Sequence, residues 1–270
     1  MKNLNTSAKT ALVTGAASGL GYELALLLAA DAYNLILVDI DNINLEKAKS
    51  MITIDYPTNI KLIEKDLSTP FAAMELFNEI GNTPIEVLIN NAGFGVYGIF
   101  SNTDWERESD MLNLHVITTT HLTKLVLKGM LERGSGKILN MSSLAAFQPG
   151  PMMSIYYASK SYILSFSEAI ANELIGTGVT VTALCPGQTD TSFQEVVSEG
   201  NCTENKISFN MGYADEVAKY GYKAMQKGKT VAVPGTFNKF LSKLPRFVSR
   251  KTATAVIRRI QDKNRGDSLV

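Results

Sequence analysis

Cysteine is scarce in this sequence, in which only Cys185 and Cys202 occur among 270 residues. Two cysteines are too few for a disulfide framework, and they lack the spacing of metal ligands, so we expect no metal site. Proline is scarce as well, with 8 residues against 20 glycines, and charged residues make up 19% of the chain against 45% hydrophobic residues. These proportions are those of a globular protein, and they exclude a disordered, collagen-like or low-complexity chain.

A net charge is also lacking, because 26 basic and 26 acidic residues cancel. No overall nucleic-acid-binding charge is therefore present, and we expect no nucleic-acid partner. The most apolar stretch, residues 24–38, is interrupted by Asp31 and Asn34 and is not a membrane span. Residues 1–15 lack the apolar segment of a signal peptide, and we expect a cytoplasmic protein.

Short runs rich in β-forming residues alternate along the chain with stretches of helical period. Most of these runs are apolar throughout, which is typical of parallel strands buried on both faces of a sheet. We therefore predict an α/β fold, a Rossmann-type doubly wound parallel sheet of about seven strands flanked by helices in a single domain. The predicted strands are Thr10–Thr14, Asn34–Asp39, Ile60–Glu64, Glu86–Asn90, Gly136–Met141, Val179–Cys185 and Thr230–Val233. Ligands of such folds bind beyond the carboxyl ends of the strands, where we expect the chemistry.

The first predicted strand leads into a glycine-rich turn and a helix. Glycine lets the backbone turn tightly and approach a phosphate, and the helix N-terminus offers N–H groups and a positive dipole end to it. Three glycines at this spacing can also occur by chance, so a glycine-rich turn without a bound phosphate stays an alternative. The residues of this turn are Thr14, Gly15, Ala16, Ala17, Ser18, Gly19, Leu20 and Gly21.

Asp39 ends the second predicted strand, at the place where dinucleotide-binding folds hydrogen-bond the adenosine ribose. Its carboxylate would repel a 2′-phosphate, and neither Ile40 nor Ala17 and Ser18 supply a cation for one. The sequence therefore favours NAD over NADP as the cofactor. The alternative is that Asp39 only caps the following helix, as Asp41 also could.

Tyr156 and Lys160 are four residues apart and share one face of a predicted helix. A lysine ammonium near a phenol lowers the pKa of the phenol towards neutrality, so that the phenol can exchange a proton with an alcohol or a carbonyl. Tyr157 has Ser161 at the equivalent position, which indicates a packing role. Further motifs follow other strands, namely Ser142 and Ser143, Asn90 to Gly93, and Pro186 with Gly187.

Five motifs in this order make the chain similar to the short-chain dehydrogenase/reductase family, in its branch of roughly 250 residues. They are TGAASGLG (14–21), NNAG (90–93), the serine strand end, YYASK (156–160) and PGQTDT (186–191), and the resemblance spans about residues 8–235. It implies a dinucleotide-binding oxidoreductase domain over residues 1–235, with a substrate loop at about 188–212. Residues 236–270 then form a basic amphipathic C-terminal extension.

The resemblance implies a role for each matching position. Tyr156 would be the acid/base, Lys160 would lower its pKa and hold the nicotinamide ribose, and Ser143 would polarise the substrate oxygen. Asn113 would support a water relay behind the lysine, with an ordinary polar helix residue as the alternative. The Asn90 side chain is better suited to tying neighbouring strands together. The implied cofactor-binding residues are Gly15, Ser18, Gly19, Leu20, Gly21, Asp39, Asp66, Leu67, Asn90, Ala92, Gly93, Tyr156, Lys160, Pro186, Gly187, Thr189 and Thr191.

Several other residues have plainer interpretations. His115 and His121 lie on the predicted helix of Asn113, and we expect surface or interface roles for both rather than catalysis. Met152 and Met153 belong to a segment expected to cover the active site, where they would make the pocket apolar and adaptable. The alternative is that they only pack this segment onto the body.

These features lead to one prediction and two alternatives. We predict an NAD(H)-dependent oxidoreductase that interconverts a secondary alcohol and a ketone or aldehyde carbonyl of an apolar small molecule by hydride transfer, with Tyr156 passing the proton. The alternatives are an NADP(H)-dependent ketone or 3-oxoacyl reductase and a catalytically silent dinucleotide-binding module. The resemblance also implies a homodimer or homotetramer, formed through the helices that carry Asn113 and Tyr156.

The end of the chain differs in charge from the rest. From Thr236 onward nine basic residues face two acidic ones, so this segment carries a charge of +7 and the body before it −7. Phe237, Phe240, Leu241 and Leu244 recur there at helical spacing. One interpretation is that this apolar stripe packs against the body or a neighbouring subunit. The other is weak contact with an anionic membrane surface near the mouth of the active site.

Overall fold

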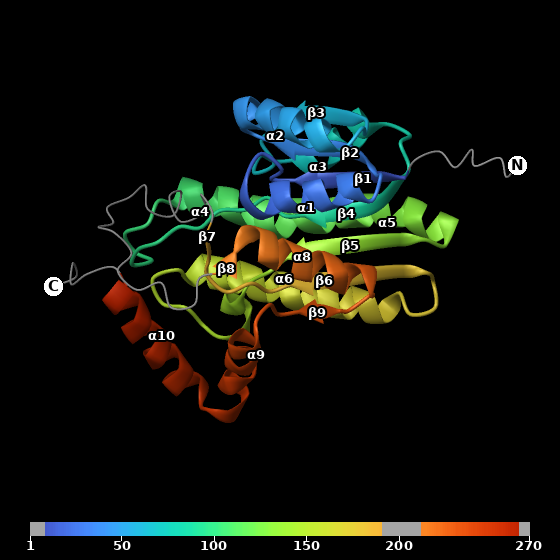
Figure 1. The fold of residues 1–270 in the computed structure, drawn as a ribbon. Helices are drawn as coiled ribbons and strands as arrows, with labels where there is room; N and C mark the ends of the chain where they lie inside the picture. The colour runs from blue at the N-terminus through green and yellow to red at the C-terminus, as the bar shows by residue number, and fades with distance from the viewer. Residues whose placement is uncertain (1–8, 191–211, 265–270) are drawn as a thin grey trace, which may run out of the picture.

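The computed structural model describes residues 9–190 and 212–264. Its main sheet has seven parallel strands in the order β3-β2-β1-β4-β5-β6-β9, and a separate pair joins β7 to β8 (Figure 1). The main strands agree with the predicted runs to within one residue at either end, so the predicted sheet is confirmed. They are β1 (Thr10–Thr14), β2 (Asn34–Asp39), β3 (Ile60–Glu64), β4 (Ile85–Asn90), β5 (Gly136–Met141), β6 (Val179–Leu184) and β9 (Val231–Ala232).

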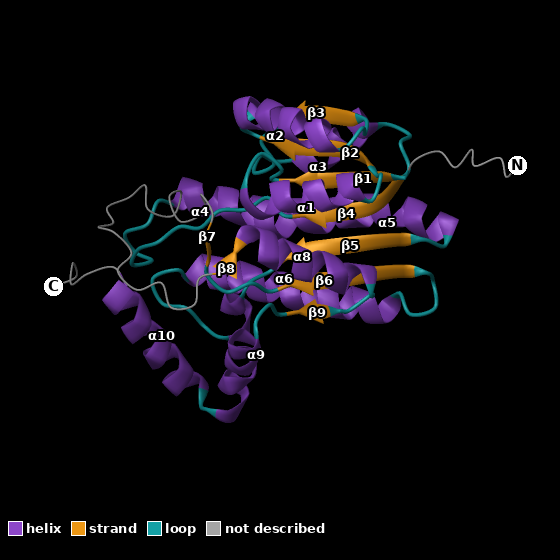
Figure 2. Ribbon diagram, viewed as in Figure 1, coloured by secondary structure: helices purple, strands orange, loops and turns teal. Residues whose placement is uncertain are grey.

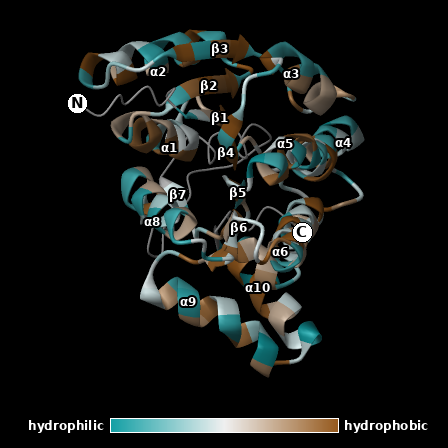
Figure 3. Cartoon of the chain, turned by 90° about the vertical axis from the view of Figure 1, so that its right-hand side faces the viewer, coloured by the Kyte–Doolittle hydropathy of each residue, from teal (hydrophilic) through white to brown (hydrophobic). Residues whose placement is uncertain are grey.

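Helices cover both faces of the sheet (Figure 3). One face carries α1, α2 and α8, and the other carries α3, α5 and α6. Their bounds are α1 (Gly19–Ala30), α2 (Asn42–Asp55), α3 (Ala72–Ile80), α5 (Thr119–Arg133), α6 (Ser154–Glu173) and α8 (Ala214–Gln226). Between α4 (Trp105–Leu112) and α5 the helix widens into a π-helical turn, η1 (Asn113–Thr118), and a 3-10 turn, η2 (Leu144–Phe147), follows β5.

The core is divided between the two faces because the sheet lies between two layers of helices. On one face, Leu24 and Leu28 of α1 pack in one cluster with Met225 of α8. On the other face, Leu76 of α3 and Leu122 of α5 belong to a second cluster. A fully buried leucine contributes about 1.5–3 kcal/mol, so continuous apolar strands stabilise both layers at once.

The topology places ligands at one edge of the sheet. The strand order reverses between β1 and β4, and the arrows in Figure 2 all point towards the side that carries α4, β7 (Thr189–Asp190) and β8 (Gly212–Tyr213). The carboxyl ends at such a reversal form a crevice in which parallel α/β folds bind their ligands.

The chain then continues into a helical segment that we call the C-terminal arm, residues 236–264. It consists of α9 (Thr236–Lys243), η3 (Leu244–Phe247) and α10 (Arg250–Asn264). Figure 1 shows α10 below the same side of the molecule as α4 and β7. Within residues 9–190 and 212–264, no helix combines the length and the apolar character needed to cross a bilayer.

Candidate active site

A cavity of about 1170 Å³ opens at the carboxyl ends of the strands. It begins at the glycine-rich turn after β1, passes the ends of β2, β3 and β4, and reaches the start of α6 and the C-terminal arm. We call the part at the glycine-rich turn the nucleotide end of the cavity, and the part at the start of α6, where Tyr156 and Lys160 lie, its reactive end. Over the described parts of the chain, no group of three or more His, Cys, Asp or Glu side chains could hold a metal ion.

The glycine-rich turn is shaped by close backbone contacts. Gly15 has φ +65°, and a Cβ at this position would lie 2.8 Å from the Cα of Ala92. A Cβ on Gly21 would overlap the carbonyl oxygen of Gly15. The turn ends at α1, whose first turn holds no acidic residue and whose Ser18 side chain makes no capping hydrogen bond. Ser18, Gly19 and Leu20 line the cavity, so the N-terminus of α1 fits a cofactor phosphate.

Asn91, which sequence reasoning passed over, holds this turn in place. Its side-chain amide donates to the carbonyl oxygens of Thr14 at 3.1 Å and Gly15 at 2.9 Å. The Thr14 hydroxyl in turn accepts hydrogen bonds from the backbone N–H groups of Asn91 and Ala92. Asn91 belongs to the motif NNAG and Thr14 to the motif TGAASGLG, so both residues stand out in the sequence. Only the structure shows that the two motifs bind each other.

Asp39 points its carboxylate towards the glycine-rich turn. One carboxylate oxygen accepts a 2.9 Å hydrogen bond from the Ala17 N–H, and the other accepts one from the Asp41 N–H at 3.1 Å. The helix-capping alternative is wrong, because the Asp41 side chain caps α2 by accepting from the Asn44 N–H. Asp39 lines the cavity, as expected of a residue that contacts the adenosine ribose.

Most of the other predicted cofactor-binding residues line the same cavity. They are Gly15, Asp66, Leu67, Ala92, Gly93, Pro186, Gly187 and Thr189. The Asn90 side chain does not, since it is buried and donates to Thr123 at 2.9 Å and to Asn140 at 2.8 Å, tying β4 to α5 and β5. Thr191 lies outside the described residues, as does most of the predicted substrate loop.

Ser143, Tyr156 and Lys160 converge at the reactive end of the cavity. Ser143 follows β5 and hydrogen-bonds the Tyr156 side chain. Tyr156 and Lys160 lie one turn apart on α6, with the lysine Nζ 5.7 Å from the centre of the tyrosine ring. The Lys160 Nζ donates to the Met141 carbonyl at 3.0 Å. Ser142 has a structural role instead, because its hydroxyl donates to the backbone oxygen of Lys160.

Burial governs the protonation of this pair. It raises the pKa of Tyr156 to about 12, against the opposing effect of the Ser143 hydrogen bond. It also lowers the pKa of the Lys160 ammonium to about 8. Burial thus favours the uncharged form of both groups, so the lowered pKa that the sequence predicts for Tyr156 is not seen in this structure.

One expectation on the helix after α4 is wrong, the surface or interface role of His115. His115, expected on the surface, is 1% exposed, and its ring centre lies 6.0 Å from that of Tyr156. Asn113 begins the same π-helical turn, is half-buried and is not among the residues that line the cavity. Its role behind Lys160 stays a prediction.

The C-terminal arm supplies a further part of the site that the sequence did not reveal. Ile260, Gln261 and Lys263 of α10 line the cavity together with three residues of α9, namely Phe237, Asn238 and Leu241. The Gln261 amide donates to the Tyr157 hydroxyl at 3.2 Å. The Tyr157 ring packs on Gly150, as a packing role predicts, but Tyr157 also lines the cavity.

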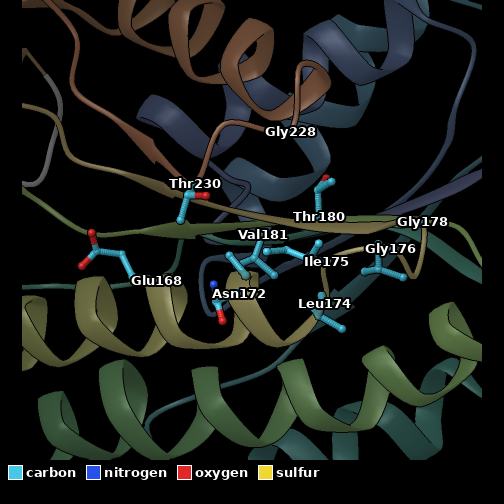
Figure 4. Close-up of a pocket in the computed structure, with 12 residues that line it drawn as sticks. Glu168, Asn172, Leu174, Ile175, Gly176, Gly178, Thr180, Val181, Gly228 and Thr230 are labelled. Atoms are coloured by element: carbon cyan, nitrogen blue, oxygen red, sulfur yellow. The ribbon is translucent and has the colours of Figure 1, made fainter.

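A second, separate hollow lies at the amino end of β6 (Figure 4). Its wall contains Asn172, Ile175, Thr180 and Thr230, and Glu168 is the one ionisable residue among the residues that line it. With a single carboxylate and no neighbouring base or nucleophile, this hollow has no catalytic arrangement.

Comparison with known proteins agrees with this geometry. The family described as short chain dehydrogenase matches residues 9–201. Ketoacyl reductase HetN of Nostoc sp. is 35% identical over 185 residues, which cover 66% of this chain and 63% of that protein. Very-long-chain 3-oxoacyl-CoA reductase of Pyrenophora tritici-repentis is 30% identical over 219 residues, covering 78% of this chain and 64% of that protein. These matches therefore span less than two thirds of the length of either relative.

Solved structures agree on the fold. A short-chain dehydrogenase from Sphingobium yanoikuyae, in complex with NADPH, superposes with a TM-score of 0.75 at 24% identity and covers 97% of this chain and 98% of its own. Residues 9–201, which match the family, contain the glycine-rich turn, Ser143, Tyr156 and Lys160, on which the resemblance rested. This chain belongs to the short-chain dehydrogenase/reductase family of NAD(P)-dependent oxidoreductases.

Proposed function

We propose that the protein is an NAD(H)-dependent oxidoreductase that interconverts a secondary alcohol and the ketone or aldehyde carbonyl of an apolar small molecule. The observation that carries this proposal is the convergence of Ser143, Tyr156 and Lys160 at one end of a cavity whose other end is a glycine-rich turn. A nicotinamide bound there supplies or accepts the hydride. The chain's own residues handle the proton and the orientation of the substrate.

Each residue of the reactive end has a distinct task in this proposal. The Ser143 hydroxyl and the Tyr156 phenol hold the substrate oxygen between them, and Tyr156 gives up or takes the proton at its hydroxyl. The Lys160 ammonium, held by the Met141 carbonyl, favours the phenolate form of Tyr156 electrostatically. Thr189, whose hydroxyl donates to the Gly187 carbonyl, would bind the nicotinamide carboxamide, the role that the family resemblance implies for it.

Charge at the nucleotide end supports a preference for NAD. Asp39 presents a carboxylate where NADP carries its 2′-phosphate, and repulsion between them weakens NADP binding. Lys65, the residue directly after β3, is a cation that lines the cavity, but Glu75 and Glu79 lie 3.4 Å and 3.7 Å from its Nζ. Its charge is therefore compensated before any cofactor binds.

The substrate end supports an apolar substrate. Its wall combines Leu144, Met153, Phe237, Leu241 and Ile260. Polar groups there include the amides of Gln148, Asn238 and Gln261, and Lys263 contributes a cation. A pocket of this kind binds apolar surface and orients it with few hydrogen bonds.

The printed names of the relatives favour a second candidate, an NADP(H)-dependent 3-oxoacyl reductase. Such a substrate also has a ketone, attached to an acyl chain that the same apolar wall would accommodate. The two candidates differ in the cofactor that they use. They also differ in the substrate, because only the 3-oxoacyl substrate carries a thioester group.

The deciding experiment titrates both cofactors and then assays turnover. We expect tighter binding of NAD than of NADP, and we expect Asp39→Ala to narrow this difference by about tenfold or more, since one charge interaction near a surface is worth about 1–4 kcal/mol. Turnover is then compared for apolar secondary alcohols, apolar ketones and a 3-oxoacyl thioester. A wild-type preference for NADP with turnover of the thioester would replace the first candidate by the second, and binding without turnover of any substrate would indicate the silent module.

We also propose that α5 and α6 form an interface with a second copy of the chain. Ile117 of η1, Leu131 of α5 and Tyr162 of α6 are exposed apolar residues on these helices. Tyr162 stacks on Phe166 with ring centres 5.9 Å apart. We expect a dimer or tetramer by light scattering, and Tyr162→Glu should produce smaller species because it buries a charge in the interface.

A further inference from the structure

His115 is a buried histidine that the proposed mechanism does not yet use. It lies in η1, and its side chain reaches α6 beneath the reactive end of the cavity. The Nδ1 atom is 2.9 Å from the Ser159 hydroxyl oxygen, one residue before Lys160. The Nε2 atom is buried and has no hydrogen-bond partner within the described chain.

The hydrogen bond with Ser159 determines which nitrogen carries the proton. The Ser159 hydroxyl has one hydrogen, and it donates this hydrogen to the Tyr156 carbonyl oxygen at 2.8 Å. The Ser159 oxygen can therefore only accept from His115, so Nδ1 carries the proton. In the neutral imidazole, Nε2 is then an acceptor with a free lone pair.

The surroundings keep the ring neutral. Burial, followed by the nearby charge of Lys160, lowers the pKa of His115 well below its ordinary value. The Lys160 ammonium and the Tyr156 phenol on α6 are the titratable groups that face the ring. Phe94 also packs against the ring, with 6.4 Å between ring centres, and the Arg107 guanidinium lies 4.6 Å from the centre of the Phe94 ring.

The His115 Nε2 atom and the Lys160 ammonium both lie next to Gly93. A Cβ built on Gly93 would lie 2.6 Å from Nε2 and 3.5 Å from the Lys160 Nζ. Gly93 has no side chain, so it places none between the two groups. An ammonium carries three hydrogens, of which the Met141 carbonyl takes one.

We propose that His115 is a positioning residue for Lys160, whose Nε2 accepts a hydrogen bond from the Lys160 ammonium, directly or through one water molecule, in the working enzyme. This contact stabilises the charged form of Lys160 inside a dry site, and it holds the ammonium at the distance from Tyr156 at which it favours the phenolate. Ser159 sets the tautomer that makes the contact attractive. The proposal rests on the proposed function, in which Lys160 acts on Tyr156.

Two substitutions of His115 distinguish the effect of its hydrogen-bond acceptor from the effect of its volume. His115→Leu fills the space without an acceptor, whereas His115→Gln places an amide oxygen close to the former Nε2 position. We expect His115→Leu to lower kcat by about tenfold or more, as for loss of a hydrogen bond to a charged group. The basic limb of the pH profile, where Lys160 loses its proton, should move to lower pH by about one unit. His115→Gln should recover most of both effects.

Ser159→Ala tests the tautomer. Without the serine, Nε2–H can form and point a hydrogen at the ammonium, so kcat should fall and the basic limb should shift in the same direction as for His115→Leu. Ser161→Ala is the matched control on the same helix, since its hydroxyl bonds only the backbone oxygens of Ala146 and Tyr157. The control should keep the wild-type profile.

The ¹⁵N spectrum of the wild-type imidazole gives a readout independent of turnover, and it should show a neutral ring protonated at Nδ1. A proton on Nε2, or a wild-type pH profile in His115→Leu, would overturn the proposal. Equal losses in His115→Leu and His115→Gln, without a pH shift, would also overturn it and assign a packing role. If instead Tyr156→Phe retained turnover, the proposed function would fail while the tautomer result still stood.

Discussion

The Gln261 amide donates a 3.2 Å hydrogen bond to the hydroxyl of Tyr157 and so joins the C-terminal arm to the active-site helix across 104 residues of chain. The same amide nitrogen lies 3.8 Å from the Met153 sulfur at the start of α6. The arm therefore forms one wall of the reactive end of the cavity, beside Tyr156. A substrate bound next to Tyr156, as we propose, would lie beside this wall.

Removing the link should weaken substrate binding more than chemistry. A neutral hydrogen bond contributes about 0.5–1.5 kcal/mol, so we expect Gln261→Ala to raise KM for an apolar substrate by about twofold to tenfold. Tyr157→Phe removes the other partner and should act similarly. Steady-state kinetics on an apolar ketone measure both variants, with the KM for the cofactor as an internal control. A loss confined to kcat would contradict a role in closing the substrate pocket.

Tyr156→Phe should retain nucleotide binding and lose at least about 10²-fold in turnover, the usual scale for a positioned proton donor. The ring stays in place, and only the hydroxyl that hydrogen-bonds Ser143 is removed. Lys160→Ala should be similarly slow and should also bind the cofactor less tightly, because it deletes a buried charge from the cavity. Calorimetry of cofactor binding and turnover with a confirmed substrate measure these effects. Near-normal turnover of Tyr156→Phe would remove the tyrosine from its assigned role.

The parts of the fold that could be predicted from the sequence are those determined by the pattern of apolar and polar residues within a short segment. Continuous apolar runs such as Leu35–Val38 located the strands because both faces of the sheet are buried. Asp39 was placed correctly since it ends a strand next to the glycine-rich turn. His115 and Gln261 were missed for a different reason. Their positions depend on a helix widened by a π-turn and on an arm folded back over the site, neither of which has a local sequence signature.

The buried histidine should make the protein sensitive to acid. Its pKa in the folded state is lowered well below 6.5, so the folded protein keeps the ring neutral where the unfolded chain binds a proton. Stability contributed by the neutral ring is complete above about pH 6.5, and it falls as the pH decreases towards the folded pKa, by up to about 1.4 kcal/mol per pH unit.

His115→Gln removes this titration. We expect its free energy of unfolding to decline less than that of the wild type between about pH 6.5 and pH 5, when both are measured by urea denaturation. His121→Gln, which changes the other histidine on an adjoining helix, is the matched control. Parallel declines in the wild type and His115→Gln would show that protonation of His115 does not contribute to acid unfolding.

The C-terminal arm combines exposed aromatic residues with clustered positive charge. Phe240 is 61% exposed and Phe247 82% exposed, and Lys243 and Arg246 lie between them. The packing interpretation accounts for the inner side of the arm, where Phe237 and Leu241 line the cavity, but not for these outer residues. An anionic membrane surface complements both features, since each basic residue near such a surface contributes about 1 kcal/mol and the aromatic rings enter the headgroup region.

We therefore expect the protein to co-sediment with vesicles that contain phosphatidylserine at low salt, and to release them as the salt concentration rises. Phe240→Ser combined with Phe247→Ser should abolish this binding and leave turnover of a small water-soluble substrate unchanged, because neither ring lines the cavity. Deleting residues 236–270 should impair folding or assembly as well, since it removes the wall formed by Phe237, Leu241 and Ile260. Neutral vesicles serve as the control for charge. Absence of binding to anionic vesicles at low salt would eliminate the membrane contact and leave the arm as the wall of the substrate pocket.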